Sequence, residues 1–234
     1  SSLNFLAYFS SMMIRQKVEI RFEKSDAIRF ISHHDLMRAM MRAARRAALP
    51  VRLTEGFNPR LRIVFPVALE VGVVSLDEVA EIELTQWLDT QEIYARLSSV
   101  FPTGLILKAV TALPLRRASR MPRRIQYRLH LKEAGLTVPP DRCRTLLQAE
   151  SLLFQRFRKN KLPKMQNVDI RPALLDIALE PDGDLRIEVA PNQKGSVRPL
   201  EALSLALNMP LDNLKHVRST KLWMELEPLA EAAQ

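Results

Sequence analysis

The sequence predicts an α+β fold in which a strand, helix, strand, strand, helix, strand unit occurs twice, with a basic linker between the two copies. Strand-like and helix-like periodicities follow one another in the same order in both halves, and matching elements lie 107 residues apart, as Val18 and Ile125 do. An arginine-rich segment separates the two halves. A single α/β domain with an irregular order of elements is the alternative interpretation.

Residues 17–113 are expected to form the first unit. Val18, Ile20 and Phe22 alternate with charged residues, which indicates a half-buried strand. Ser32 is expected to cap the helix that follows, because a short hydroxyl side chain can accept a hydrogen bond from the first helical turn. The apolar stripe of this helix is expected to consist of Met37, Met40, Met41, Ala44 and Ala48.

The rest of the first unit follows from a turn and a second amphipathic helix. Gly56-Phe57-Asn58-Pro59 has the composition of a turn. Asp89 is expected to cap a helix that Glu92 also stabilises. The apolar face of this helix is expected to carry Ile93, Leu97, Val100 and Phe101. Strands are expected over residues 61–69, 79–84 and 105–110.

Residues 124–234 are expected to form the second unit, after a basic linker at residues 114–123. Strands are expected at residues 125–131, 168–179, 185–189 and 221–226, and helices at residues 141–158 and 198–207. The βαββαβ order of both units is that of ferredoxin-like proteins, so we expect a tandem ferredoxin-like duplication. Residues 1–16 precede the first unit and are interpreted as a leader or a fusion remnant.

The net charge of +9 arises in the middle of the chain. Residues 114–164 carry 14 basic and 3 acidic side chains, and 25 of the 35 basic residues of the chain are arginines. Arginine binds phosphate through two parallel hydrogen bonds, so an RNA or DNA backbone is the expected partner. A solvated linker that keeps the chain soluble is the alternative.

Glycine and cysteine usage excludes several classes of site. None of the six glycines belongs to a dinucleotide-binding loop or a P-loop. Cys143 is the single cysteine, so the chain cannot form an internal disulfide, a four-thiolate zinc site or an iron–sulfur cluster, and no cofactor is expected. No apolar run approaches the ~20 residues that a membrane span needs. We therefore expect a cytoplasmic protein without a membrane partner.

Two segments of the first half carry a family resemblance. Ser32-His33-His34-Asp35 and Gly56-Phe57-Asn58-Pro59 are similar to motifs of the radical-SAM-linked protein family, an uncharacterised domain encoded beside or fused to a cobalamin-binding radical-SAM protein. The similarity is specific over residues 17–113 and looser afterwards. The family usually has an apolar residue at the position of His34 and a His-Pro pair where this chain has Arg60-Leu61. The resemblance implies a radical-SAM protein as a partner, and its motif residues here are Ser32, His33, Asp35, Gly56, Phe57, Asn58 and Pro59.

The start of the first helix contains the candidate catalytic residue, His33. Backbone N–H groups at a helix start attract phosphate, so His33 can be interpreted as a general base. In the structural interpretation, Ser32 caps the helix, Asp35 complements the helix dipole and the histidines are exposed. Adjacent histidines of a helix cannot converge on one metal ion, so no metal site is expected.

The polar face of the same helix is a stronger indication of function. It carries Arg38, Arg42, Arg45 and Arg46 at helical spacing. Like charges at this spacing repel, so we expect either an external polyanion or internal acids such as Glu81 or Glu83 to neutralise them. The other candidate nucleic-acid-binding residues are Arg60, Arg62, Arg116, Arg117, Arg120, Arg123 and Arg124.

Three functions from different classes remain. The leading expectation is a module that binds RNA or a ribonucleoprotein, has no catalysis of its own and acts with a separate radical-SAM enzyme. The second is a metal-independent RNA endonuclease, by analogy of fold with the CRISPR repeat-processing enzymes, with His33 as the base and Arg38 or Arg62 stabilising the phosphorane. The third is a protein-interaction adaptor whose basic faces bind an acidic partner.

Overall fold

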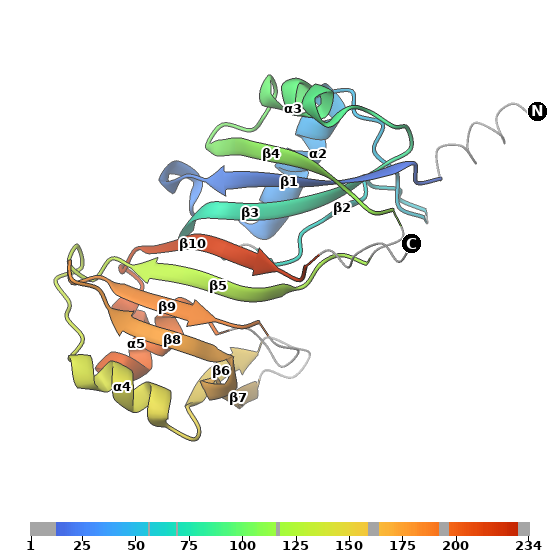
Figure 1. Ribbon diagram of the computed structural model, residues 1–234. Helices are drawn as coiled ribbons and strands as arrows, with labels where there is room; N and C mark the ends of the chain where they lie inside the picture. The colour runs from blue at the N-terminus through green and yellow to red at the C-terminus, as the bar shows by residue number, and fades with distance from the viewer. Residues whose placement is uncertain are drawn as a thin grey trace, which may run out of the picture. The chain divides into compact units, whose positions relative to one another are not determined.

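The structure is a computed structural model that describes residues 13–55, 57–68, 70–115, 118–158, 164–191 and 197–228. The chain divides into two compact units, one ending at Met121 and one beginning at Pro122 (Figure 1). The described residues form a mixed fold of four α-helices and mainly antiparallel sheet. Among them, no helix combines the length and the apolar character that crossing a membrane requires.

Some sequence expectations fall outside the described residues. These are residues 1–12 of the expected leader and Gly56, Arg116 and Arg117. The expected leader also ends too late, because its last residue, Gln16, is the first residue of strand β1 and is buried.

The first unit contains three strands of at least nine residues, one very short strand and two α-helices. In chain order these are β1 (Gln16–Lys24), α2 (His33–Arg46), β2 (Ile63–Val64), β3 (Val73–Leu84), α3 (Thr90–Ser98) and β4 (Leu105–Leu113), with a 3-10 turn at Asp26–Ile28. The strands lie in the order β4-β1-β3-β2, and each neighbouring pair is antiparallel.

Both helices of the first unit pack on one face of its sheet. Ile20 of β1 and Ile82 of β3 are fully buried in a core that includes Leu36 and Met40 of α2 and Ile93 of α3. Burying an aliphatic side chain of this size stabilises the fold by about 1.5–3 kcal/mol. Figure 1 shows α2 crossing behind β4, β1 and β3. The alternate strand residues point to the other face of the sheet.

Helix α2 begins as expected and ends at Arg46, two residues before the last residue of the expected apolar stripe. The Ser32 hydroxyl accepts a hydrogen bond from the backbone N–H of Asp35 at 3.1 Å, which confirms the predicted N-cap. Met40 and Ala44 of the expected apolar stripe are buried. Ala48 is exposed and lies beyond the helix end with a φ of 49°, so its placement on the stripe was wrong.

Strand β2 is much shorter than the expected strand over residues 61–69. It contains two residues, Ile63 and Val64, paired with Ile82 and Glu81 of β3. Pro66 follows closely and has no backbone N–H to continue a ladder. The third strand differs in the other direction, since β3 begins at Val73 and the pattern indicated only residues 79–84.

The second unit contains six strands and two α-helices. In chain order these are β5 (Pro122–Leu129), α4 (Pro140–Gln148), β6 (Leu153–Arg158), β7 (Lys164–Asp169), β8 (Leu174–Leu179), β9 (Leu185–Val189), α5 (Pro199–Leu207) and β10 (Ser219–Leu226), with 3-10 turns at Arg171–Ala173 and Leu211–Leu214. Four strands lie in the order β10-β5-β9-β8, with antiparallel neighbours, and β6 pairs with β7 in a separate two-stranded sheet.

The helix expected over residues 141–158 was wrong in its second half. Helix α4 ends at Gln148, and residues from Leu153 onward form strand β6. The guanidinium group of Arg171 explains this end, because it donates hydrogen bonds to the carbonyl oxygens of Leu147 at 2.5 Å and Ala149 at 3.1 Å. Carbonyls at a helix end lack partners inside the helix, and a side chain distant in sequence supplies them here.

One side of helix α4 is buried. Cys143 and Leu146 are buried, and burial raises the pKa of the Cys143 thiol above its ordinary value. A buried thiol of raised pKa is a weak nucleophile at neutral pH, so Cys143 acts as an apolar core residue.

Candidate nucleic-acid interface

The arginine stripe of α2 lies on the exposed side of the helix. Arg38, Arg42, Arg45 and Arg46 are all exposed, while the opposite side of the helix is buried. Arg38 makes a loose ion pair with Asp35, with 3.4 Å between Nη1 and Oδ1. Arg46 donates a hydrogen bond to the carbonyl oxygen of Val100 at 2.8 Å. Among the described residues, no acidic side chain pairs with Arg42 or Arg45.

The internal acids that were expected to neutralise this stripe bind other cations. Glu81 is almost fully buried and pairs with Lys17, with 2.7 Å between Nζ and Oε2. Glu83 pairs with Arg52 at 3.0 Å and lies 3.9 Å from Arg62. The stripe therefore keeps most of its positive charge exposed, as a surface that binds a polyanion requires.

A hairpin-like arm, described at residues 51–55 and 57–63, follows α2 and carries the Phe57-Asn58-Pro59 segment at its tip. Bridges join Val51 to Leu84 and Leu53 to Leu61. Backbone N–H groups of the arm donate from Thr54 to the Arg60 carbonyl and from Arg62 to the Arg52 carbonyl, both at 2.7 Å. These bonds hold the two sides of the arm together and attach its base to the sheet.

The outward side of this arm is cationic. Leu61 and Ile63 are buried, so the alternating Arg60 and Arg62 point outward together. Arg60 is exposed and the side chain of Arg62 is 49% exposed. Sequence patterns missed a third arginine here, Arg52, because its role depends on Glu83 of a distant strand.

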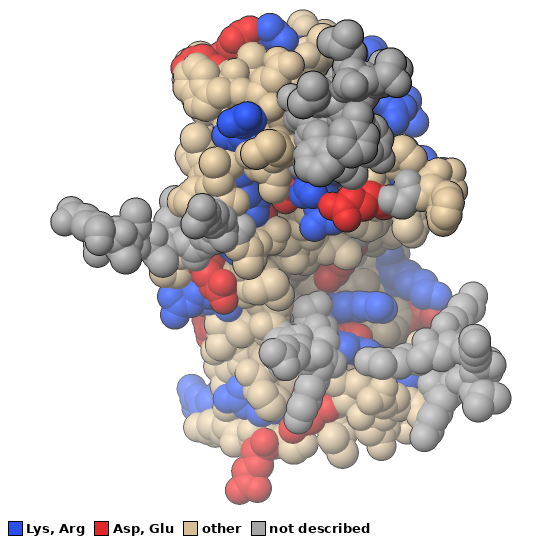
Figure 2. Space-filling model, turned by 90° about the vertical axis from the view of Figure 1, so that its right-hand side faces the viewer, with Lys and Arg blue, Asp and Glu red and all other residues tan. Residues whose placement is uncertain are grey.

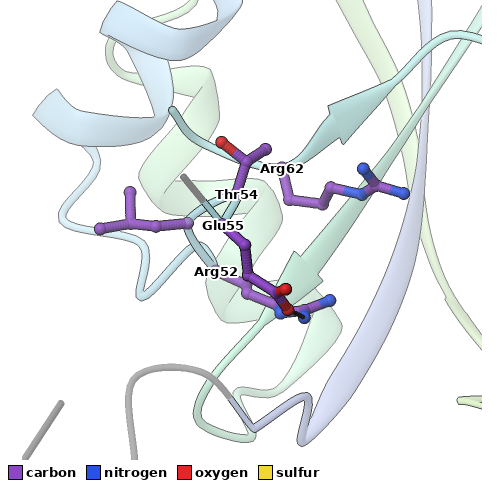
Figure 3. Close-up of a pocket in the computed structure, with 5 residues that line it drawn as sticks. Arg52, Thr54, Glu55 and Arg62 are labelled. Carbon is purple, nitrogen blue, oxygen red and sulfur yellow. Dashed lines mark hydrogen bonds and ion pairs between the residues drawn. The ribbon is translucent and has the colours of Figure 1, made fainter. Parts of the chain in front are cut away.

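A cleft of about 370 Å³ lies at the base of the arm and is lined by Arg52, Leu53, Thr54, Glu55 and Arg62. Figure 3 shows the Arg52 guanidinium group beside the Glu55 carboxylate, while Arg62 extends away from them. The distance from Arg52 Nη2 to Glu55 Oε1 is 3.3 Å. The Nε atom of Arg52 is buried and has no hydrogen-bond partner among the described residues. The cleft thus offers donors from two arginines and acceptors from one carboxylate.

Of the arginines predicted for the linker, the structure describes Arg120, Arg123 and Arg124, and they differ in exposure and in pairing. Arg120 is mostly buried and pairs with Glu19, so it is not the exposed, unpaired cation that the sequence indicated. Burial lowers the pKa of Arg120 from its ordinary value. Arg123 and Arg124 belong to strand β5, where Arg123 is exposed and Arg124 pairs with Glu188 and lies over the Trp223 ring at 6.0 Å.

Across the face shown in Figure 2, Lys and Arg side chains lie in several groups with Asp and Glu among them. On the face of the first unit's sheet that points away from the helices, basic side chains also pair with acidic ones. Arg21 of β1 pairs with Glu19 at 3.0 Å and with Asp77 at 2.8 Å. Its charged side chains are engaged with one another, and this face has no aromatic platform on β1. RNA recognition by bases stacked on a sheet, as in RRM domains, is thus not available on that strand.

In the Ser32-His33-His34-Asp35 segment, Ser32, His34 and Asp35 fit the structural interpretation, whereas His33 is partly buried and not exposed as that interpretation expected. Asp35 accepts a hydrogen bond from the Ser32 hydroxyl at 2.8 Å, and both residues stabilise the start of α2. The His33 ring packs edge-on against Phe65, with centroids 5.2 Å apart, and is partly buried. Burial lowers the pKa of His33 below its ordinary value of 6.5, the charge of His34 lowers it further and Glu78 opposes both effects. Among the described residues, no group of three potential metal ligands gathers.

The chain is thus an α+β protein in which one helix, α2, carries a row of exposed arginines. The chain belongs to a family described as "Uncharacterized protein conserved in bacteria (DUF2344)", whose profile matches residues 17–199. A search of the curated proteins finds no match.

Proposed function

We propose that this protein is an RNA-binding module that holds RNA or a ribonucleoprotein through α2. The observation that carries the proposal is the exposed stripe in which Arg42 and Arg45 have no acidic partner among the described residues. Four like charges within one helix face destabilise the free protein. A phosphate backbone removes that repulsion and releases its own counterions, which favours binding.

The proposal includes two features that have separate support. The resemblance described above supports a separate radical-SAM enzyme as a partner in the cytoplasm. The strand orders β4-β1-β3-β2 and β10-β5-β9-β8 support two ferredoxin-like units related by duplication, because matching strands occupy matching places in each unit. The inserted hairpin β6-β7 is then an addition to the second unit.

The salt dependence of RNA binding tests the proposal. The variant Arg42→Gln/Arg45→Gln removes two exposed charges and keeps helix propensity, so its stability should change by less than about 0.5 kcal/mol per site. The logarithm of the association constant for single-stranded RNA falls as the logarithm of the salt concentration rises. The steepness of this dependence should decrease by about 1.4, at about 0.7 per lost phosphate contact. Arg46 is left in place because it bonds Val100.

A charge-matched control separates the effect of losing a direct phosphate contact from the effect of losing net positive charge. Arg144→Gln/Lys215→Gln removes two cations of the second unit whose side chains are 74% and 75% exposed. This control should keep the wild-type slope. An unchanged slope in the α2 variant, or an equal change in the control, would show that α2 is not the binding surface.

The same experiment distinguishes the other two functions. Metal-independent cleavage of the bound RNA that disappears in His33→Ala would establish the endonuclease instead. Capture of a protein that survives nuclease treatment and high salt, without RNA binding, would establish the adaptor.

A further inference from the structure

Phe57 is the most exposed large apolar side chain of the described residues. Its relative exposure is 106%, which means that the ring meets water on all sides. It stands at the tip of the arm over residues 51–63, and no ring contact, hydrogen bond or cation–π contact involves it among the described residues. The core of the protein therefore gains nothing from Phe57, and leaving an aromatic ring in water is unfavourable.

The arm holds this tip in place. Its two sides are joined by the backbone hydrogen bonds of Thr54 and Arg62, and the Thr54 hydroxyl accepts a further one from the Arg60 N–H at 3.0 Å. At the base, Arg52 binds the Glu83 carboxylate of β3. Pro59 restricts the backbone directly after the tip. An aromatic ring on a braced arm loses little conformational freedom when a ligand covers it.

The surroundings of Phe57 indicate what covers it. Its neighbours are Asn58, Pro59 and the exposed Arg60, and the cationic cleft of Arg52 and Arg62 lies at the base of the same arm. A protein-binding hot spot sits at the centre of a larger apolar patch. An exposed ring on the same arm as the exposed cations Arg60 and Arg62 matches a nucleotide, which has an apolar face and an anionic group.

We infer that the arm over residues 51–63 binds an unpaired nucleotide of RNA, whose base stacks on Phe57 while the adjoining phosphates contact Arg60 and Arg62. This inference rests on the proposed RNA binding and adds that the bound RNA is single-stranded at this arm. A base in a duplex is stacked on both faces, so Phe57 selects single-stranded segments. The cleft at the base of the arm, with arginine donors and the Glu55 acceptor, accommodates the edge of another base of the same strand.

Fluorescence of 2-aminopurine tests the stacking directly. A single-stranded RNA with one internal 2-aminopurine and a duplex of the same sequence are titrated with wild type and with Phe57→Ala. Stacking on an aromatic side chain quenches this fluorophore, and wild type should quench it in the single strand. Phe57→Ala should lose the quenching and about 5- to 150-fold in affinity for the single strand, while the salt slope stays unchanged.

Two further variants and a matched control complete the design. Phe57→Trp keeps a stacking face and should retain both affinity and quenching, whereas Phe57→Leu keeps an apolar side chain and should resemble Phe57→Ala. Phe30 is a control because it is also exposed, at 68%, and already lies under the Arg29 guanidinium at 4.6 Å. Phe30→Leu should bind like wild type.

The outcomes separate this inference from the proposed function. If wild type binds RNA but Phe57→Ala binds the single strand within twofold of wild type, the inference is wrong and RNA binding stands. Equal losses on single strand and duplex, or full activity of Phe57→Leu, would also overturn stacking. If wild type binds neither RNA, both statements are wrong.

Discussion

Arg156 of β6 holds the Glu201 carboxylate of α5 with two hydrogen bonds, 2.8 Å from Nε to Oε1 and 2.5 Å from Nη2 to Oε2. Glu201 is 1% exposed, and its Oε2 also accepts a hydrogen bond from the backbone N–H of Arg198 at 3.1 Å. One carboxylate thus caps a helix and fastens the β6-β7 hairpin to the second unit. The sequence neighbourhood of neither residue reveals this pair.

Replacing Arg156 should cost considerable stability. Arg156→Met leaves the Glu201 carboxylate buried without its cation, and we expect a loss of about 3 kcal/mol in the free energy of unfolding by urea. Arg156→Met/Glu201→Gln should recover part of it, because Gln keeps the cap acceptor without the charge. The exposed pair of Arg144 and Asp141 serves as control, and Arg144→Met should cost less than about 1 kcal/mol. A loss in Arg156→Met no greater than that of the control would contradict the role given to this pair.

Gly104 should tolerate a methyl group much less well than Gly72. Both glycines have a φ of +85°, so Ala pays a similar backbone penalty of about 1–2 kcal/mol at each. A Cβ at Gly104 would lie 2.7 Å from Cγ2 of Ile28, whereas at Gly72 the nearest atom is 3.7 Å away, on Phe30. Gly104→Ala should therefore lower the unfolding midpoint in urea more than Gly72→Ala does. In an Ile28→Ala background, which lacks the contacting side-chain atoms, Gly104→Ala should lower the midpoint by less. Equal midpoints would disprove the steric argument.

Asp184 should make the stability of the protein sensitive to acid. Burial alone raises the pKa of Asp184, but the hydrogen bond from Arg128 and the charge of His130 outweigh it and hold the pKa below the ordinary 3.8. The unfolded chain then binds this proton at higher pH than the folded chain does. Stability from Asp184 is complete above pH 3.8 and is lost as pH falls through the depressed folded value.

Unfolding by urea at several pH values measures this contribution. Asp184→Asn should be less stable than wild type at neutral pH and should lose less further stability between about pH 5 and about pH 3. Asp212, whose side chain is 81% exposed, provides the control variant Asp212→Asn, which should follow the wild-type curve. Parallel curves for Asp184→Asn and wild type would show that the group contributes nothing through its ionisation.

His34 should influence the titration of His33. Burial is the main cause that lowers the pKa of His33, and the charge of His34 adds to it. In an NMR titration of the ring protons, His33 should titrate below 6.5 in wild type and closer to 6.5 in His34→Gln. Because burial remains, the variant should still not reach the ordinary value. A titration of His33 at or above 6.5 in wild type would contradict the burial of this ring.

Local patterns predicted the elements whose causes are local. The cap of Ser32 on α2 and the strand at residues 185–189 are found where periodicity and capping chemistry placed them. Both depend on side chains within a few residues of each other, so a single sequence contains the necessary information. The same holds for Asp89, which accepts a hydrogen bond from the Gln91 N–H at 2.8 Å and starts α3.

Features that depend on distant partners could not be predicted in this way. Helix α4 stops where Arg171 binds its last carbonyls, and no local signal near Gln148 announces that contact. Arg120 looked like an exposed linker cation because Glu19, which neutralises it, is far away in the sequence. In the candidate interface, composition identified the arginines, whereas their pairing with acids decides which of them can bind an anion.

This pairing also divides the arginines by the step of binding in which they act. An arginine held by a carboxylate, such as Arg186 between Asp176 and Glu180, still adds one charge to the long-range field that would attract RNA under the proposed function. An unpaired arginine of α2 adds the same charge and, in the proposed complex, would also contact the bound strand directly. Neutralising either kind should slow association similarly, while only the second kind should speed dissociation. Under the proposed RNA binding, paired and unpaired arginines would both set the rate of association, and the unpaired arginines of α2 would also set the lifetime of the complex.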